Sequence, residues 1–210
     1  MQITQEYKDF IDAQIKALTN YNTLRPADHL SSFQDHSKRV ANSMKSLAQK
    51  MGYDSTMCEA LYLATLIHDI GKTRLPVEIW DYDEVDEIGN ALKPSEDLKT
   101  KRRQHTTLGV EIVKEAFPNT WNTNPFLRLT CDLMQYHHDY LDGSGYLGKK
   151  NLSPDVQMLC ICDSYDGWTI PHPHKTAEQI SPSYIIDQKM NDGRFNQDIL
   201  KMFKEIIICQ

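Results

Sequence analysis

The feature that most constrains the fold is the stretch of residues 61–76, LYLATLIHDIGKTRLP, in which an almost wholly apolar run ends at His68-Asp69. Asp54 can cap a helix just upstream, and the run that follows is long enough for about four turns. We expect Gly71 to permit the turn that ends this helix. An imidazole and a carboxylate then lie side by side at the end of the most hydrophobic element of the chain. A divalent metal ion is their natural partner, because burying both groups without partners would cost several kcal/mol.

Composition limits the classes of protein to which the chain can belong. Its 210 residues, 40% hydrophobic and 25% charged, suit a soluble globular protein with one core. No run approaches the roughly 18 apolar residues of a membrane span, and the opening MQITQEYKDF is not a signal peptide. The five cysteines are odd in number and form no CxxC pair, which predicts reduced thiols and a cytoplasmic location. A formal net charge of −6 argues against a general binder of nucleic acid polymers.

Apolar residues at helical spacing predict an all-α fold, an HD-domain-like helical bundle in outline, with no convincing strand pattern. We expect an N-terminal helix and linker over residues 1–30, followed by one helical domain over residues 31–210. The acidic stretch of residues 80–94 is typical of a loop. The expected helices cover residues 3–20, 32–50, 55–68, 95–112, 125–136, 154–166 and 181–190, with a last one from about residue 197.

Histidines and aspartates lie at inward positions of these helices. His36 is one turn before Val40 on the apolar face of its helix, and His105 shares a face with Leu108. A lone histidine in such a place is more often a satisfied core residue than a ligand. The whole set, however, indicates a metal centre inside a helical bundle. It comprises His36, His68, Asp69, His105, His137, His138 and Asp163.

The pair His137-His138 limits how these ligands can be shared. Adjacent residues of a helix point about 100° apart, so both can be ligands only at a helix end or if they serve different metal ions. Seven ligands are also too many for one tetrahedral ion. They suit two divalent ions bridged by a carboxylate, and the chemistry of such a centre is hydrolysis at phosphorus.

Two further stretches could contact an anionic substrate. The loop DYLDGSGYLG holds Gly143 and Gly145, which allow a tight turn and a close approach of backbone N–H groups to an anion. Many surface turns look similar, so this signal is weak by itself. The basic run KTKRR at residues 99–103 is most simply an exposed helix face, and attraction of a phosphate substrate is the alternative.

The order H…HD…H…HH…D, with the segments HDIGKTRLP and HHDYLDGSGYLG, resembles the HD-GYP subgroup of the HD metal-dependent phosphohydrolases over about residues 31–200. The later segments CDSYDGW and GRFN are also similar to motifs of that family. The resemblance implies an all-helical bundle that hydrolyses cyclic di-GMP at a site of two or three iron or manganese ions. It implies that the seven residues are metal ligands, with Asp69 as their bridge. It also implies that Asp69 and Lys72 are catalytic, that Lys72 contacts phosphate, and that Tyr146 is the tyrosine of the GYP signature.

The chain departs from the family pattern at several positions, although the metal ligands are intact. Ser32 stands where members with three metals have a glutamate, so we expect two ions. Leu147 replaces the GYP proline, and Asp139 replaces the glutamate of an HHE motif. The family's RPYxK-like segment, whose arginine and lysine hold phosphate, is HPHK at residues 172–175, and only the lysine matches. The expected substrate contacts are Lys72, Gly143, Gly145, Tyr146, His172 and Lys175.

The resemblance therefore predicts a metal-dependent phosphodiesterase that converts cyclic di-GMP into pGpG, and then into GMP, with two divalent ions of iron or manganese. A signalling protein is a further expected partner, bound through the GYL loop at residues 145–147. Two alternatives stay open because the substrate segment is altered. One is a phosphohydrolase for another cyclic nucleotide or dinucleotide, and the other is a weakly catalytic signalling or scaffold protein that binds metal and nucleotide.

Overall fold

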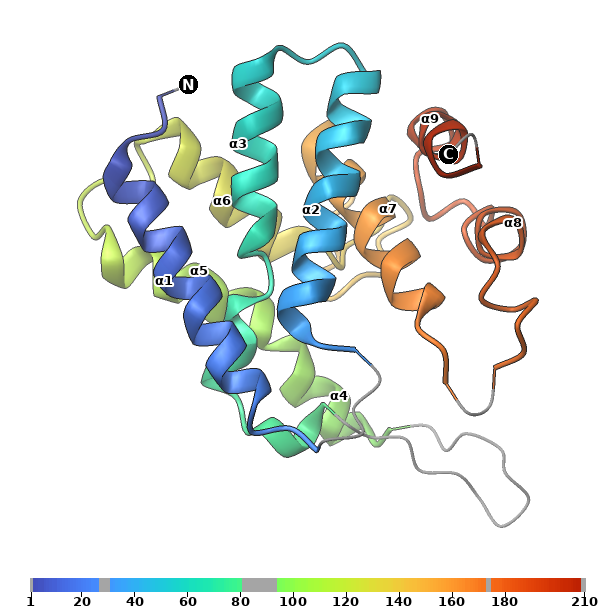
Figure 1. Ribbon diagram of the computed structural model, residues 1–210, viewed down its shortest axis with the longest axis horizontal. Helices are drawn as coiled ribbons and strands as arrows, with labels where there is room; N and C mark the ends of the chain where they lie inside the picture. Colours follow the sequence, from blue (N-terminus) through green and yellow to red (C-terminus); the bar gives the residue numbers. More distant parts are fainter. Residues whose placement is uncertain (1, 27–30, 81–93, 173–174, 209–210) are drawn as a thin grey trace.

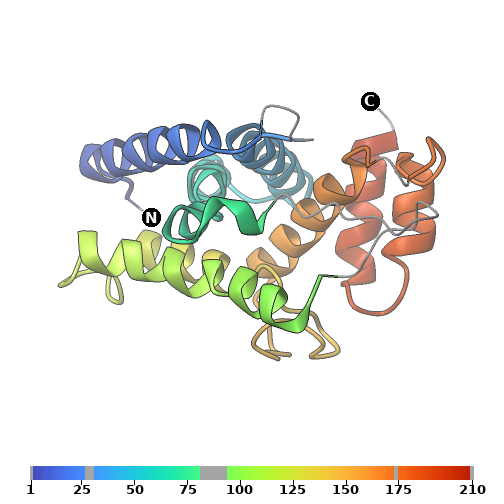
Figure 2. The same cartoon turned by 90° about the horizontal axis from the view of Figure 1, so that it is seen from below.

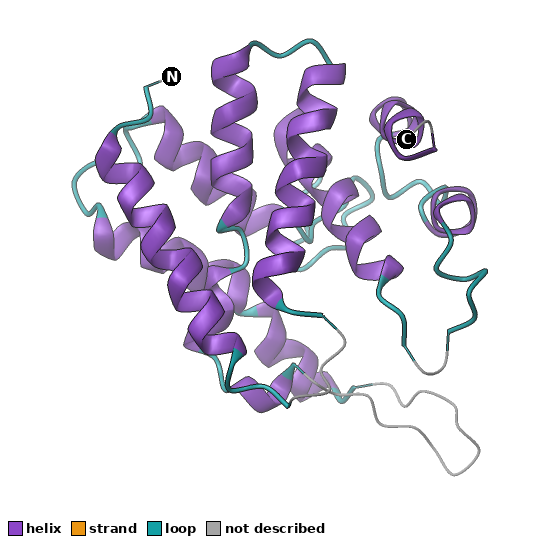
Figure 3. Ribbon diagram, viewed as in Figure 1, coloured by secondary structure: helices purple, strands orange, loops and turns teal. Residues whose placement is uncertain are grey.

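The computed structural model describes residues 2–26, 31–80, 94–172 and 175–208, and every regular element within these ranges is helical (Figure 3). This confirms the predicted all-α class. The α-helices are α1 (Gln5–Asn22), α2 (Phe33–Lys50), α3 (Ser55–Leu66), α4 (Glu96–Arg103), α5 (His105–Ala116), α6 (Pro125–Tyr136), α7 (Pro154–Thr169), α8 (Pro182–Tyr184) and α9 (Gln197–Ile208). The 3₁₀ helices η1 (Ile70–Arg74) and η2 (Val77–Ile79) follow α3, and a π-helical turn, η3 (Ile185–Lys189), follows α8. None of the described helices is long and apolar enough to cross a membrane.

Side-chain caps explain where several of these helices begin. The hydroxyl of Ser32 accepts the N–H of Asp35 at the start of α2, and the carboxylate of Asp54 accepts that of Met57 at the start of α3. Before α6, the side chain of Asn124 accepts two backbone N–H groups, and a proline occupies the first helical position. The capping residues that the local sequence indicates are therefore the ones that the structure uses.

Helices α2 and α3 form a central pair joined by a short turn, and the other elements pack around this pair (Figure 1). α7 packs against α2, α6 packs against α3, and both α1 and α5 contact η1. Figure 2 shows α1 and α5 on opposite sides of the segment that contains η1, with α8 and α9 together at the far end of the molecule. The core between these helices includes the fully buried side chains of Leu47, Leu61 and Leu133.

The N-terminal helix α1 packs onto the body of the protein. Tyr7 and Ile11 belong to the same buried cluster as the side chains of α2, α3 and α5, and Leu18 is fully buried. This packing is what an amphipathic helix with one apolar face is expected to do. The division of the chain into residues 1–30 and 31–210 stays a prediction.

The prediction that Gly71 ends the third helix is wrong. α3 ends at Leu66, and His68-Asp69 lies in the turn between α3 and η1. Gly71 lies inside η1 and is not among the glycines with a positive φ. A Cβ atom on it would lie 1.9 Å from the carbonyl oxygen of His105 and 2.5 Å from the backbone nitrogen of Gly109. Glycine at this position lets η1 lie directly against α5, which brings His68-Asp69 next to His105.

Two other expected helices are divided. The helix expected over residues 95–112 is two helices, since α4 ends at Arg103 and α5 begins at His105, with Gln104 between them. The helix expected over residues 181–190 is a single α-helical turn followed by the π-helical η3. The stretch of residues 80–94, predicted as a loop, lies outside the described residues except at its two ends.

Candidate metal centre

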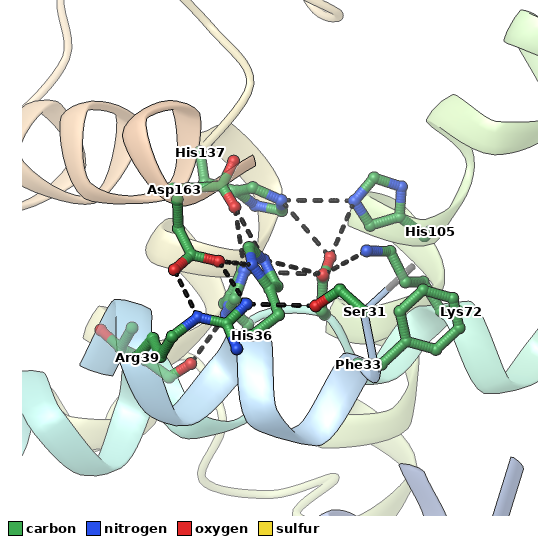
Figure 4. Close-up of polar contacts among 12 residues, drawn as sticks. Ser31, Phe33, His36, Arg39, Lys72, His105, His137 and Asp163 are labelled. Carbon is green, nitrogen blue, oxygen red and sulfur yellow. Dashed lines mark hydrogen bonds and ion pairs between the residues drawn. The ribbon is translucent and has the colours of Figure 1, made fainter. Parts of the chain in front are cut away.

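The side chains that were predicted as metal ligands converge at one place in the bundle (Figure 4). They come from α2, from the turn between α3 and η1, from the start of α5, from the end of α6 and from α7. His138 is partly exposed, and the others are buried. The buried ones are His36, His68, Asp69, His105, His137 and Asp163.

The potential ligand atoms form two groups, in each of which the atoms lie within 4.8 Å of one another. One group is His36, His68 and Asp69, and the other is His105, His137 and His138. The carboxylate of Asp69 lies between the groups. Its Oδ2 is 3.6 Å from Nε2 of His36 and 3.6 Å from Nε2 of His68. Its Oδ1 is 3.2 Å from Nε2 of His105 and 3.8 Å from Nε2 of His137. Each oxygen of Asp69 thus faces a different group of histidines, as a bridging ligand requires.

Asp163 on α7 also reaches both groups. Its Oδ1 is 3.0 Å from Nε2 of His36 and 3.5 Å from Nε2 of His68. Its Oδ2 is 3.7 Å from Nδ1 of His138. The centre therefore has two carboxylates among its histidines, whereas the sequence motif singles out only Asp69 as the bridge.

Three histidine rings are oriented by the backbone of their own segments. Nδ1 of His68 lies 2.8 Å from the carbonyl oxygen of Thr65, and Nδ1 of His137 lies 2.8 Å from that of Met134. Nδ1 of His105 makes the same contact with the carbonyl oxygen three residues before it, at 2.6 Å. When Nδ1 donates its proton in this way, the lone pair resides on Nε2, which points into the centre. Each ring is held in the tautomer that a metal ligand needs.

His36 is oriented by a side chain that the sequence reasoning did not assign to the site. Its Nδ1 lies 2.7 Å from Oδ2 of Asp166, whose carboxylate also accepts two hydrogen bonds from Arg39, at 2.7 and 2.9 Å. Burial alone would lower the pKa of His36, but hydrogen bonds to Asp163 and Asp166 outweigh it and raise the pKa to about 9. The signal that could have found Asp166 is its position one helical turn after Asp163, on the same face of α7.

The electrostatics of the centre favour the ligand form of His137, His138 and Asp69, whereas His36, with its pKa of about 9, must lose a proton to bind a metal. Burial lowers the pKa of His138 to about 3 and holds the pKa of His137 well below its ordinary value, so both rings are neutral at pH 7. Burial would raise the pKa of Asp69, but the ammonium of Lys72 and the nearby His68 keep that pKa well below its usual range. Asp69 is therefore ionised. Neutral imidazole and ionised carboxylate are the forms that bind divalent metals.

One buried atom shows how well a metal ion would fit. Nε2 of His68 is buried and has no hydrogen-bond partner among the residues that the structure describes. Leaving a buried polar atom unpaired costs about 1–3 kcal/mol, and a cation at the centre would supply the missing partner. Imidazole nitrogens together with carboxylate oxygens suit first-row divalent metals. The residues present therefore fit divalent metal binding.

Lys72 borders the centre, while its predicted contact with phosphate stays a prediction. Its ammonium contacts Oδ2 of Asp69, and it lies 4.7 Å from the ring centroid of Phe33 and 5.3 Å from that of Trp80. Trp80 is held in turn, because its Nε1 donates to the hydroxyl of Tyr21 at 2.8 Å. That hydroxyl donates to the carbonyl oxygen of residue 75, also at 2.8 Å. The aromatic wall around Lys72 comes from segments far apart in the sequence, and local patterns do not indicate it.

The glycine-rich loop after α6 binds an anion of the protein itself. The backbone N–H groups of Leu147 and Gly148 donate to Oδ1 of Asp139 at 2.8 and 3.1 Å. Gly143 has a positive φ, and its N–H donates to the carbonyl oxygen of residue 140. A Cβ atom on Gly145 would lie 2.2 Å from Cα of Asp139, so this glycine packs against the buried aspartate. Substrate contacts by the two predicted glycines stay a prediction.

Tyr146 of this loop lies beside the metal centre, as its predicted role requires. Its ring centroid is 4.5 Å from that of His138 and 6.3 Å from that of His105. Burial raises the pKa of its hydroxyl to about 12, so the group stays protonated and can donate a hydrogen bond. Leu147, at the place of the proline in the GYP signature, is 50% exposed.

Lys175, the other lysine that was predicted as a substrate contact, lies at the end of α7. Nζ of Lys175 donates to the carbonyl oxygens of Trp168 and Ile170 at the end of α7, at 3.2 Å each. Lys175 and Trp168 line a cavity with Gln179 and Lys189, and none of the seven predicted metal ligands lines it. Residues 173 and 174 lie outside the described ranges. Substrate binding by Lys175 and by His172 stays a prediction.

Comparison with protein families gives a match to the HD domain over residues 33–168, a range that includes all seven predicted ligands and Asp166. A Thermotoga maritima protein named cyclic di-GMP phosphodiesterase is 23% identical over 96% of this chain and 50% of its own length. A Vibrio cholerae protein named 3'3'-cGAMP-specific phosphodiesterase 1 is 29% identical over 78% of this chain and 35% of its own length. The chain thus spans half or less of the length of these relatives.

Solved structures show the same fold. The HD domain of the L. monocytogenes phosphodiesterase PgpH, in complex with cyclic-di-AMP, superimposes with a TM-score of 0.60 at 21% identity and covers 94% of both chains. An HDG"Y"P protein from Bdellovibrio bacteriovorus gives a TM-score of 0.62 at 19% identity, over 96% of this chain and 63% of its own. The family match covers well over half of the sequence and contains the complete set of converging histidines and aspartates. The chain belongs to the HD domain family.

Proposed function

We propose that the protein is a metal-dependent phosphodiesterase that hydrolyses cyclic di-GMP to pGpG, and pGpG on to GMP. The observation that carries this proposal is the position of Asp69, with one carboxylate oxygen toward each of two histidine groups and Lys72 beside it. The names of relatives from several bacteria support the substrate class.

In this proposal His36, His68, His105, His137, His138 and Asp163 would hold two divalent ions, iron or manganese, with Asp69 as the ligand that the two groups share. Such ions supply Lewis-acid polarisation of a phosphoryl group and a nucleophile at neutral pH. Lys72 then places a positive charge beside the bridging carboxylate, where charge develops on the phosphoryl oxygens. The aromatic wall of Phe33 and Trp80 supports the ammonium in that place through cation–π contacts.

Two ions rather than three are proposed because of Ser32. Its hydroxyl caps α2 through the N–H of Asp35 and also contacts the carboxylate of that residue. A serine at this place offers no anionic ligand for a third ion. Ser32→Glu should raise the metal content per chain, and three ions in the unchanged protein would contradict the proposal.

A second candidate substrate is 3'3'-cGAMP, which the 29% identical relative favours through its name. A weakly catalytic metal-binding and nucleotide-binding signalling protein remains the rival from another class. An interaction of the GYL loop with a signalling protein is supported by the half-exposed Leu147. We further propose a cytoplasmic location, because four cysteines of the described residues are free thiols.

The decisive experiment is anaerobic purification, metal analysis, and turnover of cyclic di-GMP, 3'3'-cGAMP and cyclic di-AMP with Fe(II) or Mn(II). We expect close to two ions per chain and cleavage of cyclic di-GMP. His68→Ala with Asp69→Ala should abolish metal binding and turnover, while His172→Ala should keep the full metal content. Full metal loading without turnover on any of the three nucleotides would favour the signalling protein.

A further inference from the structure

The four basic residues at the end of α4 differ in the contacts that their side chains make. Lys99 and Lys101 form ion pairs with acidic residues one turn earlier, at 2.7 and 2.8 Å. Arg102 donates to the backbone carbonyl oxygens of Ile79 and of the residue after it. Arg103 differs from these three. Within the described part of the chain, its exposed guanidinium has neither an ion pair nor a hydrogen bond, and its contact is with an aromatic ring.

That ring belongs to Tyr146. The guanidinium carbon of Arg103 lies 5.4 Å from the ring centroid of Tyr146, whose other neighbours are His138 at 4.5 Å and His105 at 6.3 Å. Arg103, Tyr146 and His138 thus form a row that leads from the surface to the metal centre. Arg103 is also only two residues before His105, and α4 ends at this point. The guanidinium is one aromatic ring away from the proposed metal ligands.

The chemistry of the Arg103 guanidinium defines what it can bind. Its cation–π contact with the ring of Tyr146 occupies none of its N–H donors. Those donors carry a permanent charge and match the oxygens of a phosphate. Tyr146 fixes the position of the group without consuming its hydrogen bonds. An anion held there would lie at the mouth of the centre and not on the metals themselves.

We propose that Arg103, held on the ring of Tyr146, binds the second phosphate of a cyclic dinucleotide while the first phosphate is at the metal centre. This inference rests on the proposed function and names the part of the substrate that the centre alone does not hold. It makes Arg103 a determinant of specificity for nucleotides that carry two phosphodiester groups. A cyclic mononucleotide has no second phosphate, and it gains nothing from Arg103.

The test compares Arg103→Ala, Arg103→Lys and Lys101→Ala in the Mn(II)-loaded protein. Lys101→Ala is the matched control, since it removes the same charge from the same helix at a residue that is already ion-paired. We measure the metal content, the kinetics of cyclic di-GMP hydrolysis, and the Kd for pGpG and for cyclic GMP. We expect Arg103→Ala to raise KM for cyclic di-GMP about tenfold, with kcat changed less than about twofold. The KM of Arg103→Lys should lie between those of the wild type and Arg103→Ala, and the KM of Lys101→Ala should match that of the wild type.

Binding supplies a readout that needs no turnover when the bridging phosphate of pGpG is replaced by a hydrolysis-resistant phosphorothioate. Arg103→Ala should raise the Kd for pGpG about tenfold and leave the Kd for cyclic GMP unchanged. The difference in pGpG affinity between the wild type and Arg103→Ala should shrink at high salt. Tyr146→Leu should reproduce the loss, whereas Tyr146→Phe should keep most of the affinity because the ring remains. Equal Kd and KM values for Arg103→Ala and Lys101→Ala would overturn the role of Arg103 and leave the proposed function intact. A wild type that binds the dinucleotides through Arg103 but cleaves none would refute only the phosphodiesterase. A wild type that neither binds nor cleaves them would refute both.

Discussion

Replacing Gly71 with alanine tests how the metal centre is assembled. The added Cβ atom would meet the carbonyl oxygen of His105 at 1.9 Å and the backbone nitrogen of Gly109 at 2.5 Å. Both neighbours are backbone atoms, which cannot rotate out of the way, so η1 and α5 must separate. Overpacking usually costs about 1–3 kcal/mol, and a clash with backbone belongs at or above the upper end. At about 3 kcal/mol, the melting temperature of a chain of this size should fall by about 6–12 °C.

Gly167→Ala is the matched control for this experiment. Gly167 lies within α7, and a Cβ atom on it would meet nothing within 4 Å. Alanine is favoured over glycine in a helix by about 0.5–1 kcal/mol, so this variant should be as stable as the wild type or slightly more stable. Unfolding by urea and by heat is measured on metal-free protein, and metal content is measured separately. We expect Gly71→Ala to bind metal more weakly as well, because His105 moves with α5. A Gly71→Ala variant within about 0.5 kcal/mol of the wild type would refute the close packing of η1 on α5.

Three further predictions concern the surroundings of the centre. Asp139→Ala should cost about 1–3 kcal/mol and speed proteolysis in the loop after α6, since two backbone N–H groups lose their acceptor; Asp139→Asn should cost less, and equal cleavage rates would contradict this. Asp166→Ala should weaken metal binding about 10–100-fold in a chelator competition, because His36 loses the partner that orients its ring; unchanged affinity would show that the pair is not needed. The metal-free protein should be most stable near pH 6.5. The stabilising contribution of His138 is complete above pH 6.5 and is lost as pH falls through about 3, and that of His137, whose pKa is also lowered on folding, is lost in the same direction; that of His36 is complete below pH 6.5 and is lost as pH rises through about 9. Urea unfolding between pH 4 and 10 checks this, and a stability that rises steadily with pH would exclude it.

The sequence predicts the parts of this protein that depend on local rules. Helix starts follow from capping residues such as Ser32 and Asp54, whose partners are three residues away. The seven predicted ligands are recognisable because histidine and aspartate are unusual at the inward positions and ends of apolar helices. Periodicity alone was therefore sufficient to predict the all-α class. It is also the reason that the ligand residues could be expected at one place before any helix was positioned.

The parts that could not be predicted depend on contacts between distant segments. The pairing of Asp166 with His36 requires the relative rotation of α2 and α7, which no local pattern contains. Gly71 was interpreted as a helix terminator because its clash with α5 involves backbone far along the chain. The same holds for Gly145, whose packing against Asp139 involves a contact that the local sequence does not indicate. Sequence shows that a position needs glycine, but the neighbour that imposes this need is a property of the fold.

The hydroxyl of Tyr21 joins the N-terminal helix by hydrogen bonds to Trp80, which borders the candidate metal centre. It accepts a hydrogen bond from Trp80, whose ring faces both Lys72 and His105, and it donates one to the backbone after Lys72. Any change that reorients the end of α1 must either break these two bonds or carry Trp80 with it. If a ligand at the centre moves Trp80, its binding is coupled to the position of α1. Such coupling is reciprocal, so a shift of α1 would then alter the affinity at the centre by the same free energy.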